Sequence, residues 1–452
     1  MTLWRWQELL TALDLTIPEN GPDIQGVSID SRSLQTGDLF IALSGDPGPG
    51  FHTSSENSRN GHSFLGAAEI AGAGALLVSE ATDVPLPALT VPDTLKGLWQ
   101  LGQASRKRMN GRVAAITGSA GKTTARYWLE EILRDQASTH ASTGSYNNHW
   151  GVPLSLARMP TTTEYGIFEI GMNQTGEIQP LSELVRPDVA MILNVLPAHI
   201  GNLGSIEAIR TEKLSIQYGL LPDGILLVPY DLADFVNDRQ SVTFGFDERA
   251  DIWAEHSGST ALIHIEDREF PLALSVSGEH RLMTALAVLA IAHTLSADME
   301  AGIAVIQKLG TPPGRGNHIH VAGRTIVDDS YNANPVSMEF ALKALGKHPA
   351  MRRIALLGEM LELGPESEGM HKNIAGVCTN VDLVMTFGPG FTNVSDAFGS
   401  CFQGHLNSVD EFDLSSFAGQ TREGDVILVK GSNKVFWSRD FVDYLVSAIA
   451  RL

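Results

Sequence analysis

A run of small, hydroxyl and basic residues, Gly118-Ser-Ala-Gly-Lys-Thr-Thr124, has the composition of a phosphate-binding loop. The β-branched run 112–117 before it predicts a buried strand, and the apolar spacing in 123–133 predicts a helix. A strand, a glycine loop and a helix in this order direct backbone N–H groups and the positive end of the helix dipole at a phosphate. Lys122 would add a charge for the terminal phosphates, and the Thr123 hydroxyl suits Mg²⁺. The candidate nucleotide ligands are Gly118, Ser119, Ala120, Gly121, Lys122, Thr123 and Thr124.

This loop is shorter than the strict pattern, which has a glycine five residues before Gly121, where this chain has Ile116. Taken alone, it indicates dependence on a nucleoside triphosphate, and a glycine-rich turn without a ligand is the alternative.

Further candidates come directly after expected strands. Glu169 lies at the end of the apolar run 165–168, His199 follows the run 192–196, and Asp328 with Asp329 follows 325–327. The carboxyl ends of parallel strands collect ligands, and Mg²⁺ prefers hydroxyl and carboxylate oxygens, so Thr123 and Glu169 predict a magnesium site. These residues also have structural interpretations. His199 could be a hydrogen-bonding surface group, and Asp328 could simply start a turn.

Lys213 lies in a helical pattern with Glu212 beside it. A solvated helix face is the ordinary interpretation of such a pair. Its occurrence behind a phosphate loop favours a functional role instead.

The composition favours a large α/β enzyme of about three domains. The chain has 452 residues, 43% apolar and 19% charged, with a formal net charge of −20, which disfavours nucleic acid or an anionic membrane as a partner. Cys378 and Cys401 form neither a disulfide framework nor a zinc cluster. No signal-peptide pattern is evident, and the apolar run 283–295 is too short to span a bilayer, so we expect a cytoplasmic protein.

Strands and helices alternate along the chain, which predicts mainly parallel sheets. The basic stretch 106–111 and the Pro/Gly-rich stretch 311–316 suggest two boundaries. We therefore expect a small N-terminal α/β domain at 1–108, a central ATP-binding domain at 109–314 and a C-terminal Rossmann-like domain at 315–452. The central domain should be a P-loop ATPase-type parallel sheet with helices on both faces.

The motifs together resemble the Mur ligase family over essentially the whole chain. The residues that carry the resemblance are Ser28-Ile-Asp-Ser-Arg-Ser33, the loop 118–124, Ser145-Tyr-Asn-Asn-His-Trp-Gly-Val-Pro153, Glu169, His199, Lys213, Gly314-Arg315, Asp328-Asp-Ser-Tyr-Asn-Ala-Asn-Pro335, Gly358-Glu-Met-Leu-Glu-Leu-Gly364 with His371, and Leu428-Val-Lys-Gly-Ser432. The stretches 328–335 and 358–364 favour the member that adds D-alanyl-D-alanine, and the Asp-Asn-Pro-Arg motif of a sister ligase is missing.

The resemblance implies an ATP-dependent, ADP-forming carbon–nitrogen ligase of peptidoglycan precursor synthesis. ATP would phosphorylate the carboxylate of a UDP-N-acetylmuramoyl tripeptide, and D-Ala-D-Ala would attack the acyl phosphate. Two Mg²⁺ ions are implied, with Thr123 and Glu169 at the first, and His199 and a carbamylated Lys213 at the second. We expect a monomer without nucleic-acid or membrane partners.

The resemblance also implies the remaining ligand contacts. Lys122 and Arg315 would face the phosphates and Asp329 the ATP ribose. Substrate contacts would come from Asp30, Ser31, Arg32, Asn147, Asn148, Asn332, Glu359, Glu362 and Lys430.

Three departures from the family pattern stand out. Arg281 and Thr284 occupy the positions where the family commonly has asparagines near adenine, the segment 47–59 is extra, and Asn433 stands where arginine is usual. The first departure keeps a non-catalytic nucleotide-binding paralogue as an alternative. A sister amino-acid ligase of the folate or cyanophycin type is a second alternative.

Overall fold

The structure is a computed structural model that describes residues 2–16, 20–44, 60–197, 203–236, 239–275, 278–361 and 363–452. The chain forms two compact units. The first comprises Met1–Asn194, Arg210–Leu272 and Met283–Gln307, and the second comprises Val195–Ile209, Ala273–Leu282 and Lys308–Leu452.

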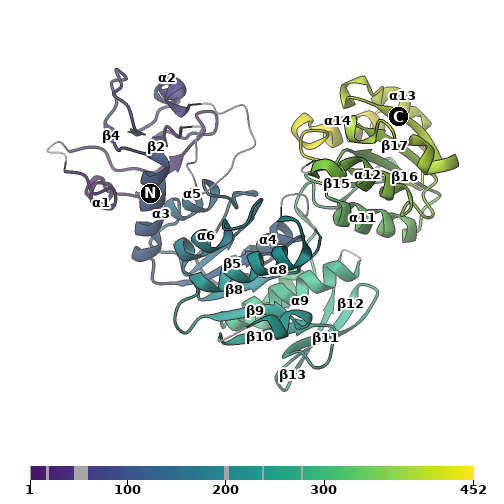
Figure 1. The fold of residues 1–452 in the computed structure, drawn as a ribbon, viewed down its shortest axis with the longest axis horizontal. Helices are drawn as coiled ribbons and strands as arrows, with labels where there is room; N and C mark the ends of the chain where they lie inside the picture. The colour runs from purple at the N-terminus through teal and green to yellow at the C-terminus, as the bar shows by residue number, and fades with distance from the viewer. Residues whose placement is uncertain are drawn as a thin grey trace. The chain divides into compact units, whose positions relative to one another are not determined.

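The first unit begins with a four-stranded parallel sheet of order β1-β2-β3-β4 (Figure 1). Its strands and helices are β1 (Gly26–Ser28), β2 (Asp38–Ile41), β3 (Ala75–Val78), β4 (Ala88–Thr90), α1 (Trp6–Ala12), α2 (Leu65–Ile70) and α3 (Thr94–Arg108). Successive side chains of a strand point to opposite faces. Leu39 and Ile41 therefore share one core with α1 and α3, and Phe40 shares another with α2. Helices thus cover both faces of this sheet.

Helix α3 corrects one sequence prediction, because the stretch 106–108 is not a linker but the last turn of this helix. Basic residues are favourable at a helix C-terminus, where the helix dipole is negative. The buried Arg106 also donates hydrogen bonds to the carbonyl oxygens of Val185 and Arg186, at 2.9 Å each. The basic pattern therefore marks an anchored helix end.

The second sheet of this unit has the order β13-β12-β11-β10-β9-β8-β5-β7-β6. Its strands are β5 (Arg112–Thr117), β6 (Thr139–Ala141), β7 (Tyr165–Glu169), β8 (Val189–Ile192), β9 (Ile225–Pro229), β10 (Ser241–Gly245), β11 (Ile252–Ser257), β12 (Thr260–Ile265) and β13 (Arg268–Ala273). Strands β6 to β11 pair in parallel with their neighbours, whereas β11 and β12 pair antiparallel. The antiparallel addition differs from the expected parallel sheet, and the alternating exposure of β12 and β13 is typical of strands with one face in solvent.

The helices that accompany this sheet are α4 (Lys122–Arg134), α5 (Gly151–Ala157), α6 (Ile178–Val185), α8 (Ile206–Leu214), α9 (Glu279–Thr294) and α10 (Met299–Ile306). The predicted strand at 112–117 and the predicted helix after it are confirmed as β5 and α4. The apolar run 283–295 lies almost wholly in α9, and most of its side chains are buried. No helix in the described part of the chain has the length and apolar character needed to cross a membrane.

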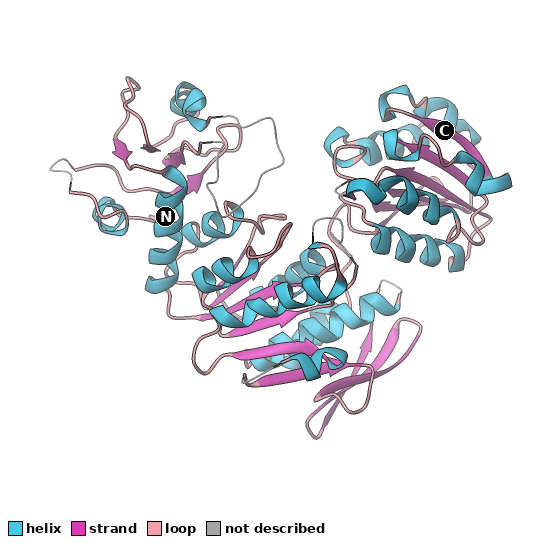
Figure 2. Ribbon diagram, viewed as in Figure 1, coloured by secondary structure: helices cyan, strands magenta, loops and turns pink. Residues whose placement is uncertain are grey.

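The second unit contains a six-stranded sheet of order β14-β15-β19-β16-β17-β18 (Figure 2). Its elements are β14 (Asn317–Val321), β15 (Arg324–Asp329), β16 (Arg352–Gly358), β17 (Leu383–Phe387), β18 (Phe402–Leu406), β19 (Asp425–Lys430), α11 (Pro335–Lys347), α12 (Ser367–Ala375), α13 (Leu414–Gln420) and α14 (Phe441–Ile449). All neighbours pair in parallel except β14 and β15. Ile354 and Leu356 share a core with α14, and Ala355 and Leu357 share one with α11, so both faces are covered.

The expected fold class is confirmed as a mixed α/β architecture dominated by parallel sheets. One detail differs from the sequence prediction, since Asp328 and Asp329 end strand β15 instead of following it. Both pair with β19, opposite Val429 and Lys430, and this pairing extends the strand. The domain boundaries at 108/109 and 314/315 stay predictions.

Candidate active site

The phosphate loop joins β5 to α4 in the first unit. Gly121, at the N-terminal cap of α4, has φ of +82°, a left-handed conformation that glycine adopts without strain. Lys122 begins the helix, and its Nζ donates a 2.7 Å hydrogen bond to the carbonyl oxygen of Gly118. The lysine side chain therefore folds back over its own loop, with its charge beside the loop backbone.

Asn194, two residues after the end of the neighbouring strand β8, holds the same loop, and sequence reasoning missed it. Its side-chain oxygen accepts hydrogen bonds from the N–H groups of Ser119 at 2.9 Å and Ala120 at 3.0 Å. Its side-chain nitrogen donates to the carbonyl oxygen of Ala120 at 3.1 Å. A phosphate bound by these two N–H groups would have to displace Asn194. A polar residue after an apolar run is the available signal, but the apolar pattern predicts a strand over the whole of 192–196, whereas β8 ends at Ile192.

Glu169 is the last residue of β7 and lies opposite Ile116 of β5, directly before the loop. Its side chain is buried, at 1% exposure. One carboxylate oxygen accepts a 2.7 Å hydrogen bond from the side-chain amide of Asn147, and the other is buried without a hydrogen-bond partner in the described part of the chain. A buried carboxylate oxygen left unpaired is costly, so this position suits a cation.

Thr123, the predicted partner of Glu169, is also buried, and its hydroxyl lies 3.4 Å from the hydroxyl of Ser145. A hydroxyl, one carboxylate and phosphate oxygens form a donor set that Mg²⁺ accepts. The residues therefore fit the predicted metal. Within the described ranges, no three His, Cys, Asp or Glu side chains form a metal cluster.

Lys213 and Glu212 do not form the solvated helix face that is usual for such a pair, because both are buried in α8. The two carboxylate oxygens of Glu212 accept from the backbone N–H groups of Gly176 at 2.8 Å and Ile178 at 2.9 Å. Burial lowers the pKa of Lys213 well below its usual value, and the nearby charge of Lys122 acts in the same direction. The Lys213 amine is thus disposed to be neutral and nucleophilic.

Two predicted site residues, His199 and Glu362, lie outside the described residues. The segment 47–59, noted as extra, lies outside them as well.

In the second unit, three predicted ligand residues lie together. The Nζ of the buried Lys430 forms a 2.7 Å ion pair with Asp329 and a 3.2 Å hydrogen bond with the carbonyl oxygen of Asn332. Asp329 and Lys430 are also paired in register between β15 and β19. The carboxylate and the amine that the resemblance assigns to ATP and substrate therefore neutralise each other in this structure.

Arg315 lies in the turn before β14, with its guanidinium 4.1 Å from the ring centre of Tyr331. The side chain of Arg281 donates a 2.8 Å hydrogen bond to the carbonyl oxygen of Arg315. Asp328 supports the same turn by accepting from the N–H of Gly314 at 2.8 Å. The unexpected arginine at 281 thus helps to hold the turn that carries a predicted phosphate ligand.

Glu359 directly follows β16, and His371 of α12 bonds the next residue of the same loop. Glu359 accepts a 3.0 Å hydrogen bond from the N–H of Gly390. The buried His371 accepts from the N–H of Met360 at 2.9 Å, and burial lowers the pKa of its imidazole. A neutral, fully bonded histidine of this kind positions the loop after β16.

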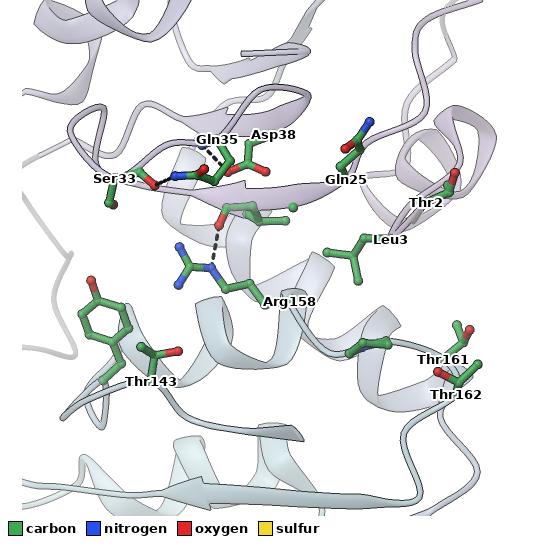
Figure 3. A pocket seen from close by; sticks show the side chains of 14 residues that line it. Thr2, Leu3, Gln25, Ser33, Gln35, Asp38, Thr143, Arg158, Thr161 and Thr162 are labelled. Carbon is green, nitrogen blue, oxygen red and sulfur yellow. Dashed lines mark hydrogen bonds between the residues drawn. The ribbon is translucent and has the colours of Figure 1, made fainter. Parts of the chain in front are cut away.

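The predicted UDP-facing residues lie in the turn after β1. Asp30 accepts hydrogen bonds from the guanidinium of Arg32, which lowers the pKa of the Asp30 carboxyl. The Arg32 side chain is 87% exposed, and Ser31 between them is partly exposed. Asn148 caps the start of α5 by accepting from the N–H groups of Trp150 and Gly151. A cavity of about 510 Å³ opens beside this turn, lined by residues of β1 and β2 on one side and by the segments that follow β6 and α5 on the other (Figure 3).

Family comparisons match two parts of the chain. Residues 116–292 match the Mur ligase middle domain, and residues 314–433 match the glutamate ligase domain of the Mur ligases.

The chain is 34% identical to the UDP-N-acetylmuramoyl-tripeptide–D-alanyl-D-alanine ligase of Escherichia coli, over 84% of this chain and 85% of that protein. It is similar to a crystal structure of MurF from Acinetobacter baumannii, with a TM-score of 0.83, 27% identity and coverage of 99% of this chain and 100% of that one. It is also similar to the MurF ligase of Thermotoga maritima in complex with ADP, with a TM-score of 0.78, 25% identity and coverage of 94% and 98%. The chain has a phosphate loop with a buried carboxylate beside it. It also matches two domain models of one family and is 34% identical to a member of that family. It therefore belongs to the Mur ligase family.

Proposed function

We propose that this protein is an ATP-dependent, ADP-forming ligase that joins D-alanyl-D-alanine to a UDP-N-acetylmuramoyl tripeptide in peptidoglycan precursor synthesis. The relative of 34% identity carries the name of this activity, and a solved relative was crystallised with ADP. The observation that carries the proposal is the buried, unpaired carboxylate oxygen of Glu169 at the end of the strand next to the phosphate loop.

The reaction divides into two steps. The terminal carboxylate of the tripeptide attacks the γ-phosphorus of ATP, so a carboxyl oxygen–phosphorus bond forms and ADP leaves. The amine of the dipeptide then attacks the carbonyl carbon of this acyl phosphate, a carbon–nitrogen bond forms, phosphate leaves and the amine loses a proton. Both steps need positioning and neutralisation of negative charge more than a covalent nucleophile on the protein.

The residues of the first unit suit these tasks. Lys122 would bind the β- and γ-phosphates, and the helix N-terminus behind it favours negative charge. Thr123 and Glu169 would hold a Mg²⁺ ion, which would neutralise phosphate charge when bound. Asn147, already bonded to Glu169, would orient that carboxylate and contact the muramoyl part of the substrate.

Lys213 would be carbamylated, and with His199 it would hold a second Mg²⁺. The lowered pKa of the Lys213 amine supports this proposal, because only the neutral amine reacts with carbon dioxide. Its product is a carbamate, which converts a buried cation into a carboxylate-like ligand.

The remaining assignments follow the family resemblance. Arg315 would bind the phosphates and Asp329 the ribose of ATP. Asp30, Ser31, Arg32, Asn148, Asn332, Glu359, Glu362 and Lys430 would contact the UDP-sugar or the peptide. We further propose a monomer that works in the cytoplasm, where ATP and UDP-sugars are made, with domains at 1–108, 109–314 and 315–452.

Arg281 and Thr284 motivate one alternative, a paralogue that binds nucleotide without catalysis. Incubation of the protein with ATP, Mg²⁺, UDP-N-acetylmuramoyl tripeptide and D-Ala-D-Ala, followed by mass spectrometry, separates the possibilities. We expect the UDP-linked pentapeptide with D-Ala-D-Ala, and none with glutamate or with L-Ala-L-Ala. ADP binding without any peptide product would favour the paralogue, and extension with glutamate would favour a sister ligase.

A further inference from the structure

The side chain of Asn194 bonds both backbone polar groups of Ala120, in the middle of the phosphate loop. Its oxygen accepts from the Ala120 N–H at 3.0 Å, and its nitrogen donates to the Ala120 carbonyl oxygen at 3.1 Å. The same side-chain oxygen accepts from the N–H of Ser119 at 2.9 Å. The backbone N–H groups of such a loop are the donors that bind phosphate oxygens. A neutral amide thus occupies two of the donors that the loop would offer to a nucleotide.

The backbone next to Asn194 supports the loop independently of this side chain. The N–H of Leu193 donates to the carbonyl oxygen of Thr117 at 2.9 Å, and the N–H of Ser119 also donates to the backbone oxygen of Asn194 at 3.2 Å. Gly118 lies so close that an added Cβ would be 2.9 Å from the Cβ of Leu193. The backbone therefore fixes the position of the loop, and the side-chain amide adds its bonds at the donors for phosphate.

A phosphate can reach these donors and replace the amide. Ala120 and Asn194 are partly exposed, and Gly121 is exposed. Hydrogen bonds to an ionised group are roughly twice as strong as those between neutral groups, so the Ala120 N–H binds a phosphate oxygen more strongly than an amide oxygen. Lys122 and the N-terminus of α4 favour the same negative charge. A neutral ligand lacks this advantage and would leave Asn194 in place.

We propose that Asn194 is a built-in competitor for the phosphate site, which occupies the N–H groups of Ser119 and Ala120 until a nucleotide phosphate displaces it. This inference rests on the proposed ATP-dependent function and adds to it a residue that sets the affinity of the loop. When only a fraction of the molecules can bind a ligand, the apparent dissociation constant rises by the inverse of that fraction. Asn194 thereby lowers the affinity for nucleotide and makes binding depend on phosphate charge.

Isothermal titration of the full chain with ADP and with adenosine tests the proposal. Asn194→Ala removes the competitor and keeps the backbone bonds, so we expect ADP to bind more tightly by about threefold or more. Adenosine carries no phosphate and should gain no affinity. The matched control is Asn373→Ala, at an exposed position of α12, which should leave the affinity for ADP unchanged.

Hydrogen exchange of a peptide that contains residues 118–121, measured by mass spectrometry, gives a second readout. Without nucleotide, the Ala120 N–H should exchange faster in Asn194→Ala than in the unchanged protein, because its acceptor is gone. Saturating ADP should protect the peptide equally in both proteins, because a phosphate oxygen then accepts from this N–H. Faster exchange in the variant even with ADP would show that Asn194 stays bonded beside the nucleotide, and it would overturn the proposal.

Weaker or unchanged ADP binding by a folded Asn194→Ala protein would overturn the proposal as well. If this variant does not fold, Asn194→Ser takes its place with the same expected results, because serine has a shorter side chain and no amide. ADP affinity that does not depend on residue 194, in a protein that forms the UDP-linked pentapeptide, would refute only this inference. Tighter ADP binding by Asn194→Ala, without amide formation by the unchanged protein, would refute only the ligase function.

Discussion

Glu169 combines burial with a carboxylate oxygen that forms no hydrogen bond with any residue the structure describes. The strand pairing that places it opposite Ile116 also fixes its distance from the phosphate loop. A structural role would be served by a fully bonded carboxylate, whereas a cation-binding role needs the free oxygen.

Glu169→Gln keeps the size of this side chain and an oxygen that can accept from Asn147. It removes the charge and replaces the free oxygen with an N–H₂ group, so we expect the turnover rate to fall by about 100-fold or more. The apparent Mg²⁺ requirement should rise in a phosphate-release assay. Glu183→Gln, on the exposed face of α6, is the control and should behave as the unchanged protein. Wild-type turnover in Glu169→Gln would remove Glu169 from the site.

The proposed carbamate on Lys213 can be tested by removing the amine that would carry it. We expect Lys213→Ala to lose activity that added bicarbonate does not restore, because the amine that captures carbon dioxide is gone, while acetate partly restores it. Lys308→Ala, at an exposed position, should retain activity. Phosphate release measured across an acetate series decides the point, and full activity in Lys213→Ala without acetate would contradict the assignment.

At the scale of elements, α8 and α6 are joined by a buried carboxylate. Glu212 bonds the N–H of Ile178, the first residue of α6, which the helix itself leaves unpaired, and the N–H of the exposed Gly176 just before the helix. Glu212→Ala should therefore lower the free energy of unfolding by roughly 1–3 kcal/mol, the cost of leaving the buried Ile178 N–H without a partner. Chemical denaturation measures the change, with Glu183→Ala as the surface control. A difference below about 0.5 kcal/mol would show that water replaces the carboxylate.

The turn 314–316 depends on the first residues of α9. Arg281 bonds the carbonyl oxygen of Arg315, and Gly316, with φ of +82°, lies so close that an added Cβ would be 2.4 Å from an Arg281 nitrogen. We expect Arg281→Ala to raise the KM for ATP several-fold with a smaller effect on kcat, because Arg315 would lose its support. Arg281→Lys should restore the KM for ATP only in part, since lysine lacks the planar guanidinium fork. Arg268→Ala, on the exposed β13, is the control, and an unchanged KM in Arg281→Ala would contradict this account.

Local signals predicted several elements well. The boundaries of β5 and the start of α4 follow from β-branched residues, a glycine turn and a 3.6-residue apolar period, all contained within 112–134. The extended β15 was less predictable, because Asp328 and Asp329 join the strand through pairing with β19, about a hundred residues away. Arg106 was misread for a similar reason, since its charge is satisfied by carbonyl oxygens of residues 185 and 186.

The residues of the candidate site also divide into those with a local sequence signal and those whose roles depend on distant contacts. Glu169 was identifiable because it directly ends an apolar strand, and Lys122 and Thr123 because they follow a glycine loop. The roles of Asn194 and Glu212 were harder to predict, because they are hydrogen bonds to backbone groups of the phosphate loop and of α6. Functional contacts made to a distant backbone leave little trace in the sequence.

At the scale of the whole molecule, the proposed function is one reaction that couples three substrates. The phosphate loop and the Glu169 carboxylate of the first unit, and Arg315 and Lys430 of the second, each suit one part of a three-substrate ligase. Each also suits a simpler protein, such as a nucleotide-binding paralogue or an uncoupled ATPase. Coupling between the substrates is therefore the property that distinguishes the proposed function.

The most direct test measures phosphate release from ATP with UDP-N-acetylmuramoyl tripeptide present, with and without D-Ala-D-Ala. We expect sustained phosphate release to require all three substrates, and each phosphate released to correspond to one UDP-linked pentapeptide formed. Release that proceeds equally without the dipeptide, or that continues without pentapeptide formation, would contradict the proposed function.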